Sequence, residues 1–275
     1  GIRFDFDSYD CIGIWTPIKA DAPFICLEPW CAPPTNDGKT REDLDTKKGL
    51  FNRIYHIVRS IMLGRKARII ENLTLLKNGK ILDYGAGTGY FARTMEKRGW
   101  DVTAIEKSPQ ARELALKEFG FSMLPEEHLA EIKDRSLDVV TLWHVMEHIQ
   151  DLDGFWDELY RILDDTGIAV IALPNSKSYD AKRYNEDWAA YDVPRHLWHF
   201  TPMTVMRWGE KHGFILERQM TMPFDGFYIS MLSERYKGSR MPGIKGLWNG
   251  VKGWFATCTR REASSSIIYV FRKKR

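Results

Sequence analysis

Hydrophobic and polar positions along this chain follow two periods, one typical of helices and one of strands. Apolar residues recur at helical spacing from Leu50 to Met62, which predicts an amphipathic helix there. Short apolar runs predict strands at residues 80–84, 102–106, 137–143 and 167–173. Helical patterns between these runs cover residues 90–98, 108–119 and 153–163. Strands that alternate with helices in this way predict an α/β fold with a doubly wound parallel sheet.

The two ends of the chain depart from this alternation of strands and helices. Residues 265–271 alternate like one more strand. Near the start, three short segments at residues 2–7, 9–15 and 24–30 resemble strands, and a loop rich in proline, asparagine and glycine follows at 33–38. We therefore expect a boundary near residues 35–46, with a β-like N-terminal extension (1–45) and a main domain (46–275).

Composition narrows the class of protein. The chain has 275 residues, of which 44% are apolar, so it can bury a sizeable core. Its net charge is only +3, which does not suggest a dedicated nucleic-acid binder. The longest apolar runs are too short to span a bilayer, and the first residues lack a signal-peptide pattern. Four cysteines without a CxxC pair argue against a zinc ribbon, so we expect a reduced, cytoplasmic protein.

Residues 81–92 carry the clearest chemical pattern, a strand that runs into a glycine turn and then a helix. They read Ile-Leu-Asp-Tyr-Gly-Ala-Gly-Thr-Gly-Tyr-Phe-Ala. Gly85, Gly87 and Gly89 allow positive φ and a close approach of backbone to ligand. Glu106 ends the next strand, where an acid accepts hydrogen bonds from ribose hydroxyls. The combination indicates a bound nucleoside cofactor.

The glycine spacing separates cofactor classes. Dinucleotide enzymes favour GxGxxG, which opens a helix N-terminus to pyrophosphate. This chain has Asp-x-Gly-x-Gly-x-Gly, with Asp83 before the first glycine. S-adenosylmethionine has no phosphate but carries an ammonium group, which suits a nearby carboxylate. The pattern favours a methyltransferase over a nicotinamide-dependent oxidoreductase, and a non-catalytic cofactor-binding interaction module is a third alternative.

Residues 46–275 resemble class I S-adenosylmethionine-dependent methyltransferases, the broad group that includes ubiquinone-biosynthesis O-methyltransferases. The resemblance implies a Rossmann-like seven-stranded sheet whose last strand, here residues 265–271, runs antiparallel. Many relatives carry Gly-Asp after the third strand to meet the adenine, whereas this chain has Pro125-Glu126-Glu127 nearby. The implied cofactor-binding residues are Asp83, Gly85, Ala86, Gly87, Thr88, Gly89, Glu106, Lys107, Trp143 and His144.

An aromatic and charged insertion at residues 179–202 follows the fifth strand. Ligands of open α/β sheets bind beyond the carboxyl ends of the strands, so we expect this insertion to wall the pocket of a small-molecule, sugar or lipid-linked acceptor. His196 and His199, with Asp192 and Arg195 beside them, are the candidate catalytic bases. Alternatively, they only satisfy backbone carbonyls in a packed loop. The histidines lack the clustering with cysteine that zinc sites show, so we expect no metal.

The region between Tyr236 and Arg261 contains six basic residues and no acid. Apolar residues at positions 244, 247, 248, 251, 254 and 255 fall on one helical stripe. Such a helix over residues 240–258 could make weak contact with an anionic membrane surface, or its stripe could pack on its own domain. Glycines at 243, 246, 250 and 253 weaken an autonomous helix and favour the second interpretation. The oligomeric state does not follow from the sequence.

Residues 2–34 resemble a short piece of the aldose-epimerase (galactose-mutarotase-like) family. The resemblance lies in Ile12-Gly13-Ile14-Trp15 and in residues 24–30. It matches Glu28 to the catalytic base of that family. However, the large β-sandwich that forms the sugar pocket is missing, and about thirty residues cannot bury such a site. We therefore expect an inactive segment.

Overall fold

The computed structural model describes residues 11–15, 26–30, 50–222 and 224–274. Two compact units divide the chain, one of Gly1–Arg65 with Asp192–Arg195 and the other of Lys66–Tyr191 with His196–Arg275. The strand expected at residues 2–7, the loop at 33–38 and the centre of the boundary near 35–46 lie outside the described residues. The division at residue 45 therefore stays a prediction.

The first unit contains a pair of short strands. β1 (Cys11–Trp15) and β2 (Cys26–Trp30) run antiparallel, with Cys11 opposite Trp30 and Trp15 opposite Cys26. These strands confirm two of the three expected near the N-terminus, while the resemblance to aldose epimerases stays a prediction. α1 (Leu50–Thr74) begins in this unit, at the first residue of the expected helix, and continues into the second unit.

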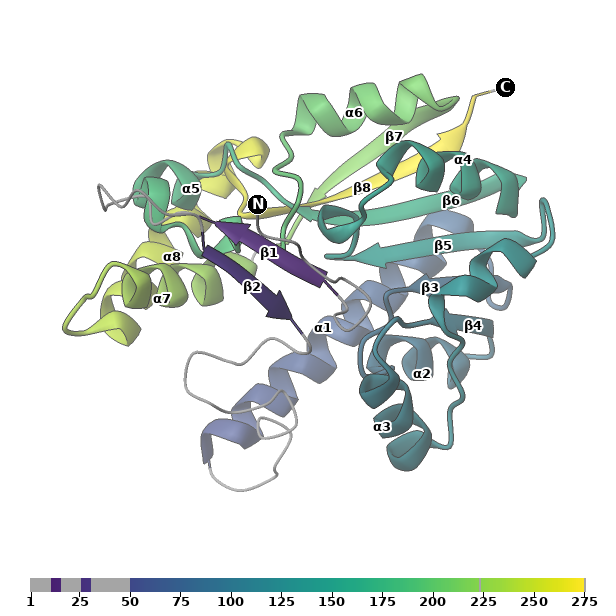
Figure 1. The fold of residues 1–275 in the computed structure, drawn as a ribbon, viewed down its shortest axis with the longest axis horizontal. Helices are drawn as coiled ribbons and strands as arrows, with labels where there is room; N and C mark the ends of the chain where they lie inside the picture. The colour runs from purple at the N-terminus through teal and green to yellow at the C-terminus, as the bar shows by residue number, and fades with distance from the viewer. Residues whose placement is uncertain (1–10, 16–25, 31–49, 223, 275) are drawn as a thin grey trace, which may run out of the picture. The chain divides into compact units, whose positions relative to one another are not determined.

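The second unit is built on a six-stranded sheet in the order β4-β3-β5-β6-β8-β7 (Figure 1). Every pairing is parallel except those of β8, which runs antiparallel to both β6 and β7. The prediction of a doubly wound α/β fold with an antiparallel last strand is therefore confirmed. The strand bounds are β3 Lys80–Tyr84, β4 Asp101–Ile105, β5 Leu137–Trp143, β6 Leu163–Pro174, β7 Phe214–Thr221 and β8 Ser266–Lys273.

The expected number of seven strands is not reached among the described residues. Beyond β4, pairing is reduced to one parallel bridge between Ile105 and Leu124. Leu124 donates to Ala104 O and accepts from the Glu106 amide, each at 2.9 Å. A 3-10 helix begins at Glu126, so the next residue that could donate to β4 is already helical and the ladder ends. The seventh strand is therefore cut short to a single residue.

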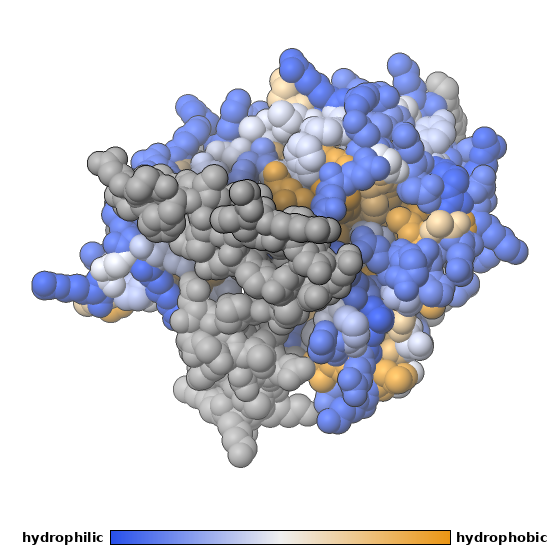
Figure 2. Space-filling view, in the orientation of Figure 1, coloured by the Kyte–Doolittle hydropathy of each residue, from blue (hydrophilic) through white to orange (hydrophobic). Residues whose placement is uncertain are grey.

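Most of the core lies between the sheet and the helices on its faces. Trp156, fully buried in α4, contacts Phe214 and Phe271 with ring centroids 5.4 and 5.2 Å apart. α4 and α6 lie along one side of the sheet (Figure 1), and blue hydrophilic side chains dominate the outer surface there (Figure 2). The helix bounds are α2 Tyr90–Glu96, α3 Pro109–Phe119, α4 Leu152–Ile162, α5 Tyr179–Tyr184, α6 Pro202–Lys211, α7 Asp225–Tyr236 and α8 Pro242–Thr259.

Three helices gather at the carboxyl edge of the sheet (Figure 1). α5 follows the end of β6, α7 follows the end of β7, and α8 precedes the antiparallel β8, which starts at this same edge. The glycine turn after β3 opens onto this edge as well, so the topology brings the predicted cofactor and acceptor regions together. No helix in the described ranges is long and apolar enough to cross a bilayer.

Candidate active site

The glycine turn after β3 has the backbone geometry that its sequence predicts. Gly85, Gly87 and Gly89 have φ values of 72°, 56° and 77°. A Cβ on Gly85 would lie 2.4 Å from a methyl carbon of Val145, so a side chain there would collide with the loop after β5. At Gly87 nothing lies within 4 Å of a built Cβ, which leaves the middle of the turn open to a ligand. Gly89 then caps α2.

Glu106 lies against this turn. Its Oε2 accepts a 2.7 Å hydrogen bond from the Gly87 amide and its Oε1 accepts one of 2.9 Å from Ser108 N. Lys107 points into solvent, with its Nζ 3.9 Å from Glu126 Oε2. Glu126, in the segment where relatives carry Gly-Asp, accepts from the Tyr84 hydroxyl at 2.8 Å. Two carboxylates therefore lie beside the turn, where ribose and adenine contacts were expected.

Asp83 is buried at the end of β3. The Thr141 hydroxyl donates to Asp83 Oδ1 at 2.8 Å. Burial raises the pKa of Asp83 to about 7, against the opposing effects of the Thr141 hydrogen bond and the nearby Lys66 ammonium. This carboxyl lacks a full counter-charge, which suits the approach of a cationic ligand.

Lys66 is a member of this site that the sequence did not single out. Its ammonium lies 4.1 Å from the centroid of the Trp143 ring. Burial lowers the pKa of Lys66, while the attraction of Asp225 and Asp83 acts to raise it. Trp143, the last residue of β5, also packs edge-on against Phe91 of α2. One lysine in a long helix has no sequence pattern that marks it, and only the folded position of α1 reveals it.

His144 forms the centre of a charged cluster just after β5. Its φ of 59° turns the chain sharply, and its amide donates to Ala172 O at 3.0 Å. His144 Nε2 lies 3.2 Å from Asp225 Oδ2, and Nδ1 lies 3.4 Å from Glu147 Oε1. Burial acts to lower the pKa of His144, but the hydrogen bonds and charges of Asp225 and Glu147 together raise it to about 9. The sequence predicted His144 here but not its two acidic partners.

His196 and His199 occupy different surroundings. His196 Nδ1 lies 2.8 Å from Ala190 O, and its ring contacts that of His148 at 4.7 Å between centroids. His199 Nε2 lies 2.9 Å from Tyr191 O. Asp192 and Arg195, expected to act beside them, form an ion pair with each other. Both histidines therefore bond a backbone carbonyl, as the alternative to a catalytic role predicts. Of the two, only His196 adjoins the charged cluster.

Glu147 connects His196 to the residues after β5. Its backbone carbonyl accepts from the Leu197 and Trp198 amides at 2.8 and 3.3 Å, which holds the segment after His196 in place. Its carboxylate is fully buried, and apart from the 3.4 Å ion pair between Oε1 and His144 neither oxygen has a hydrogen-bond partner among the described residues. The ligand atoms of Glu147, His148 and His196 lie within 4.8 Å of one another, close enough to hold a metal ion. The structure thus forms a cluster that the sequence did not show, and the expectation of no metal stays a prediction.

Comparison with known proteins agrees with this geometry. A family model described as a methyltransferase domain matches residues 57–219, more than half of the chain. A malonyl-[acyl-carrier protein] O-methyltransferase from Serratia marcescens is 28% identical over 130 residues, which cover 46% of this chain and 50% of that protein. A ubiquinone biosynthesis O-methyltransferase from Alkalilimnicola ehrlichii is 27% identical over 175 residues, which cover 59% and 69%. The chain spans about half the length of several curated relatives that it matches.

Solved structures share the fold. A phosphoethanolamine N-methyltransferase 2 from Haemonchus contortus, solved in complex with S-adenosyl-L-methionine, has a TM-score of 0.54 at 17% identity. The likeness covers 77% of this chain and 53% of that one. At this identity the comparison supports the architecture of the sheet and leaves the roles of individual residues to be tested.

Proposed function

The chain belongs to the class I S-adenosylmethionine-dependent methyltransferases, and from this premise we propose that it methylates a small-molecule, sugar or lipid-linked acceptor. The observation that carries the proposal is the arrangement of Asp83, the glycine turn and Glu106 at one edge of the sheet. The open space at Gly87 and the poorly compensated Asp83 carboxyl fit a cofactor that is cationic and carries a ribose.

Each polar group of the site suits one part of the cofactor. Glu106 would accept hydrogen bonds from the ribose hydroxyls in exchange for the one from the Gly87 amide. Asp83 would face the ammonium group and Lys66 the carboxylate of the methionine portion. When bound, S-adenosylmethionine supplies a methyl carbon that its positive sulfur activates toward a nucleophile in line with the carbon–sulfur bond.

The chain's own contribution to transfer is positioning and, for a hydroxyl or protonated amine, removal of a proton. Positioning reacting groups supplies up to about 7–11 kcal/mol of a barrier reduction in favourable cases. Of the two candidate bases, His196 is better supported because it adjoins the buried Glu147 carboxylate, whose charge stabilises an imidazolium. His199 lies against Tyr191, farther along the loop, and serves as the comparison.

Cofactor titration tests the proposed class of ligand. We expect calorimetry to show binding of S-adenosylmethionine and S-adenosylhomocysteine and no binding of NADH. Glu106→Ala should weaken binding at least tenfold, with Glu118→Ala, at an exposed acid of α3, as the matched control. Binding of NADH alone would favour the oxidoreductase. Binding of S-adenosylmethionine without methylation in an acceptor screen would favour the non-catalytic module.

Turnover of histidine variants tests the base once an acceptor is found. His196→Ala should lower kcat at least a hundredfold with cofactor affinity unchanged, as general bases contribute about 10²–10⁴-fold. His199→Ala should retain most activity. Unchanged turnover in both variants would remove the base from the mechanism.

A further inference from the structure

Helices α7 and α8 pack against each other through backbone contact. A Cβ on Gly246 would lie 2.5 Å from Met231 Cα, and one on Gly250 would lie 2.9 Å from Phe227 Cα. Between these glycines, Asn249 is buried and donates to Glu234 Oε1 at 3.1 Å. The glycines that weaken an isolated helix therefore form the buried side of α8, and close contact with α7 stabilises it.

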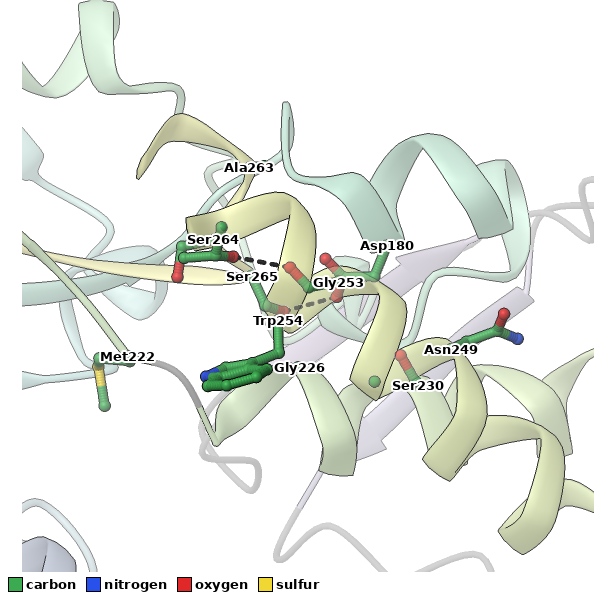
Figure 3. Close-up of a pocket in the computed structure, with 12 residues that line it drawn as sticks. Asp180, Met222, Gly226, Ser230, Asn249, Gly253, Trp254, Ala263, Ser264 and Ser265 are labelled. Carbon is green, nitrogen blue, oxygen red and sulfur yellow. Dashed lines mark hydrogen bonds between the residues drawn. The ribbon is translucent and has the colours of Figure 1, made fainter. Parts of the chain in front are cut away.

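Beside this helix pair, α5 is bonded to the residue that precedes β8 (Figure 3). The Asp180 carboxylate of α5 accepts from Ser265 Oγ at 2.6 Å and from Trp188 Nε1 at 2.9 Å. Trp254 of α8, which is 43% exposed, lines a small pocket together with Gly226 (Figure 3). A Cβ on Gly253 would lie 3.4 Å from Tyr179 Cδ1 of α5, so α8 packs against α5 as well as α7.

The outer face of α8 is apolar. With 3.6 residues per turn, the apolar side chains at positions 244, 247, 248 and 255 lie on the side of the helix opposite Gly246 and Gly250. More than half of each side chain is exposed, from 54% at Leu247 to 68% at Ile244. The interpretation that this stripe packs on its own domain is therefore wrong for these residues. We define the outer face as Ile244, Leu247, Trp248 and Phe255.

Positive charge borders this face. Lys245 and Lys252 lie about a quarter turn from the outer face on one flank, and Lys252 Nζ is 5.4 Å from the centroid of the Trp248 ring. Residues 237–261 carry six basic residues and no acid, in a chain whose net charge is +3. The rest of the chain is therefore net negative, and two of these six basic residues, Lys245 and Lys252, flank the outer face.

We propose that the outer face of α8 docks on a bilayer surface that contains anionic phospholipid. A helix lying in the interface buries apolar side chains below the headgroups, while flanking lysines extend toward phosphates. The outer face has this arrangement, because tryptophan and phenylalanine would lie below the headgroups and the lysines on its flank would lie at the level of the phosphates. Anionic lipid supplies the charge complementary to these lysines. α8 has 18 residues and cannot cross the bilayer, so it would lie along the surface.

Vesicle co-sedimentation of the full chain tests the proposal without cofactor or acceptor. We expect binding to phosphatidylcholine vesicles that contain phosphatidylglycerol and at least tenfold weaker binding to phosphatidylcholine alone. Leu247→Ser with Trp248→Ser should reduce binding at least tenfold at all salt concentrations. Lys245→Gln with Lys252→Gln should reduce it mainly at low salt, because screening already weakens the charge attraction at high salt.

A matched control separates docking from general surface hydrophobicity. Leu116 of α3 is 55% exposed and Lys117 follows it, so Leu116→Ser with Lys117→Gln removes the same chemistry from another helix. This control should bind vesicles like the wild type, and circular dichroism should show that every variant is folded. Absence of wild-type binding at low salt, or equal loss in the control, would overturn the proposal. A dimer that Leu247→Ser with Trp248→Ser dissociates, without vesicle binding, would assign the face to a second copy instead.

Discussion

Replacing Asp83 with asparagine is expected to stabilise the cofactor-free protein and to weaken cofactor binding. Burial raises the pKa of this carboxyl from 3.8 to about 7. Between those values the folded chain holds a proton that the unfolded chain has released, so stability falls as pH rises through this window. Asparagine is neutral throughout, and its side-chain oxygen still accepts from the Thr141 hydroxyl.

The size of the effect follows from the same two pKa values. The difference between 3.8 and about 7 is roughly three pKa units, each worth about 1.36 kcal/mol, so the full cost above pH 7 is roughly 4 kcal/mol. Lys66 loses a carboxylate neighbour in the variant, which offsets part of the gain. We therefore expect the free energy of unfolding of Asp83→Asn to exceed that of the wild type by about 2–4 kcal/mol at pH 8 and by little at pH 4.

Urea unfolding from pH 4 to 8 without cofactor measures the first half of this prediction. Calorimetry with S-adenosylmethionine at pH 7.5 measures the second, where we expect at least tenfold weaker binding by the variant. Glu118→Gln, at an exposed acid of α3, is the control and should change neither quantity. A stability difference that does not vary with pH would refute the assigned pKa. Unchanged cofactor affinity would refute contact between Asp83 and the ammonium group.

Three further variants probe neighbouring features. Lys66→Met should raise the KM for S-adenosylmethionine at least fivefold with little change in kcat, because Lys66 is proposed to bind the cofactor carboxylate; an unchanged KM would remove it from the pocket. Since the pKa of His144 is raised to about 9, its charge stabilises the fold below about pH 6.5, and this contribution is lost as pH rises through about 9. The unfolding free energy of the wild type should therefore fall relative to His144→Gln between about pH 6.5 and 9 in urea titrations. Gly246→Ala should destabilise by about 1–3 kcal/mol through its clash with α7, whereas Gly243→Ala, with open space around it, should stabilise by up to about 1 kcal/mol in thermal unfolding.

Features set by contiguous residues could be predicted from the sequence. The glycine turn is one, because strand, positive φ and helix start follow each other between Ile81 and Tyr90. Ser108 and Pro109 are another, since Ser108 Oγ accepts from the Ala111 amide at the start of α3. In both cases each residue acts on its own backbone or on that of a near neighbour. Local stereochemistry therefore decides the structure.

Features that depend on distant residues could not be predicted. His144 and Asp225 are 81 residues apart, and no periodicity connects them. Strand pairing beyond β4 ends because a 3-10 helix begins at Glu126, two residues after Leu124, and this matters only once Leu124 is known to be the partner of Ile105. The glycines of α8 predict only a weak isolated helix, because their contact surface, α7, is separate in sequence. Tertiary contact overrode local propensity in each case.

The charged cluster and the outer face of α8 share one structural element. Asp225 is the first residue of α7 and holds His144, while Phe227 and Met231 of the same helix contact the glycines of α8. A shift of α7 by one helical turn, about 5.4 Å, would break the 3.2 Å pair between Asp225 and His144. Such a shift would remove one of the two carboxylates that face the His144 ring and leave the buried Glu147 as its remaining acidic partner. The pair between Asp225 and His144 therefore helps to fix the start of α7, the helix on which the glycines of α8 pack.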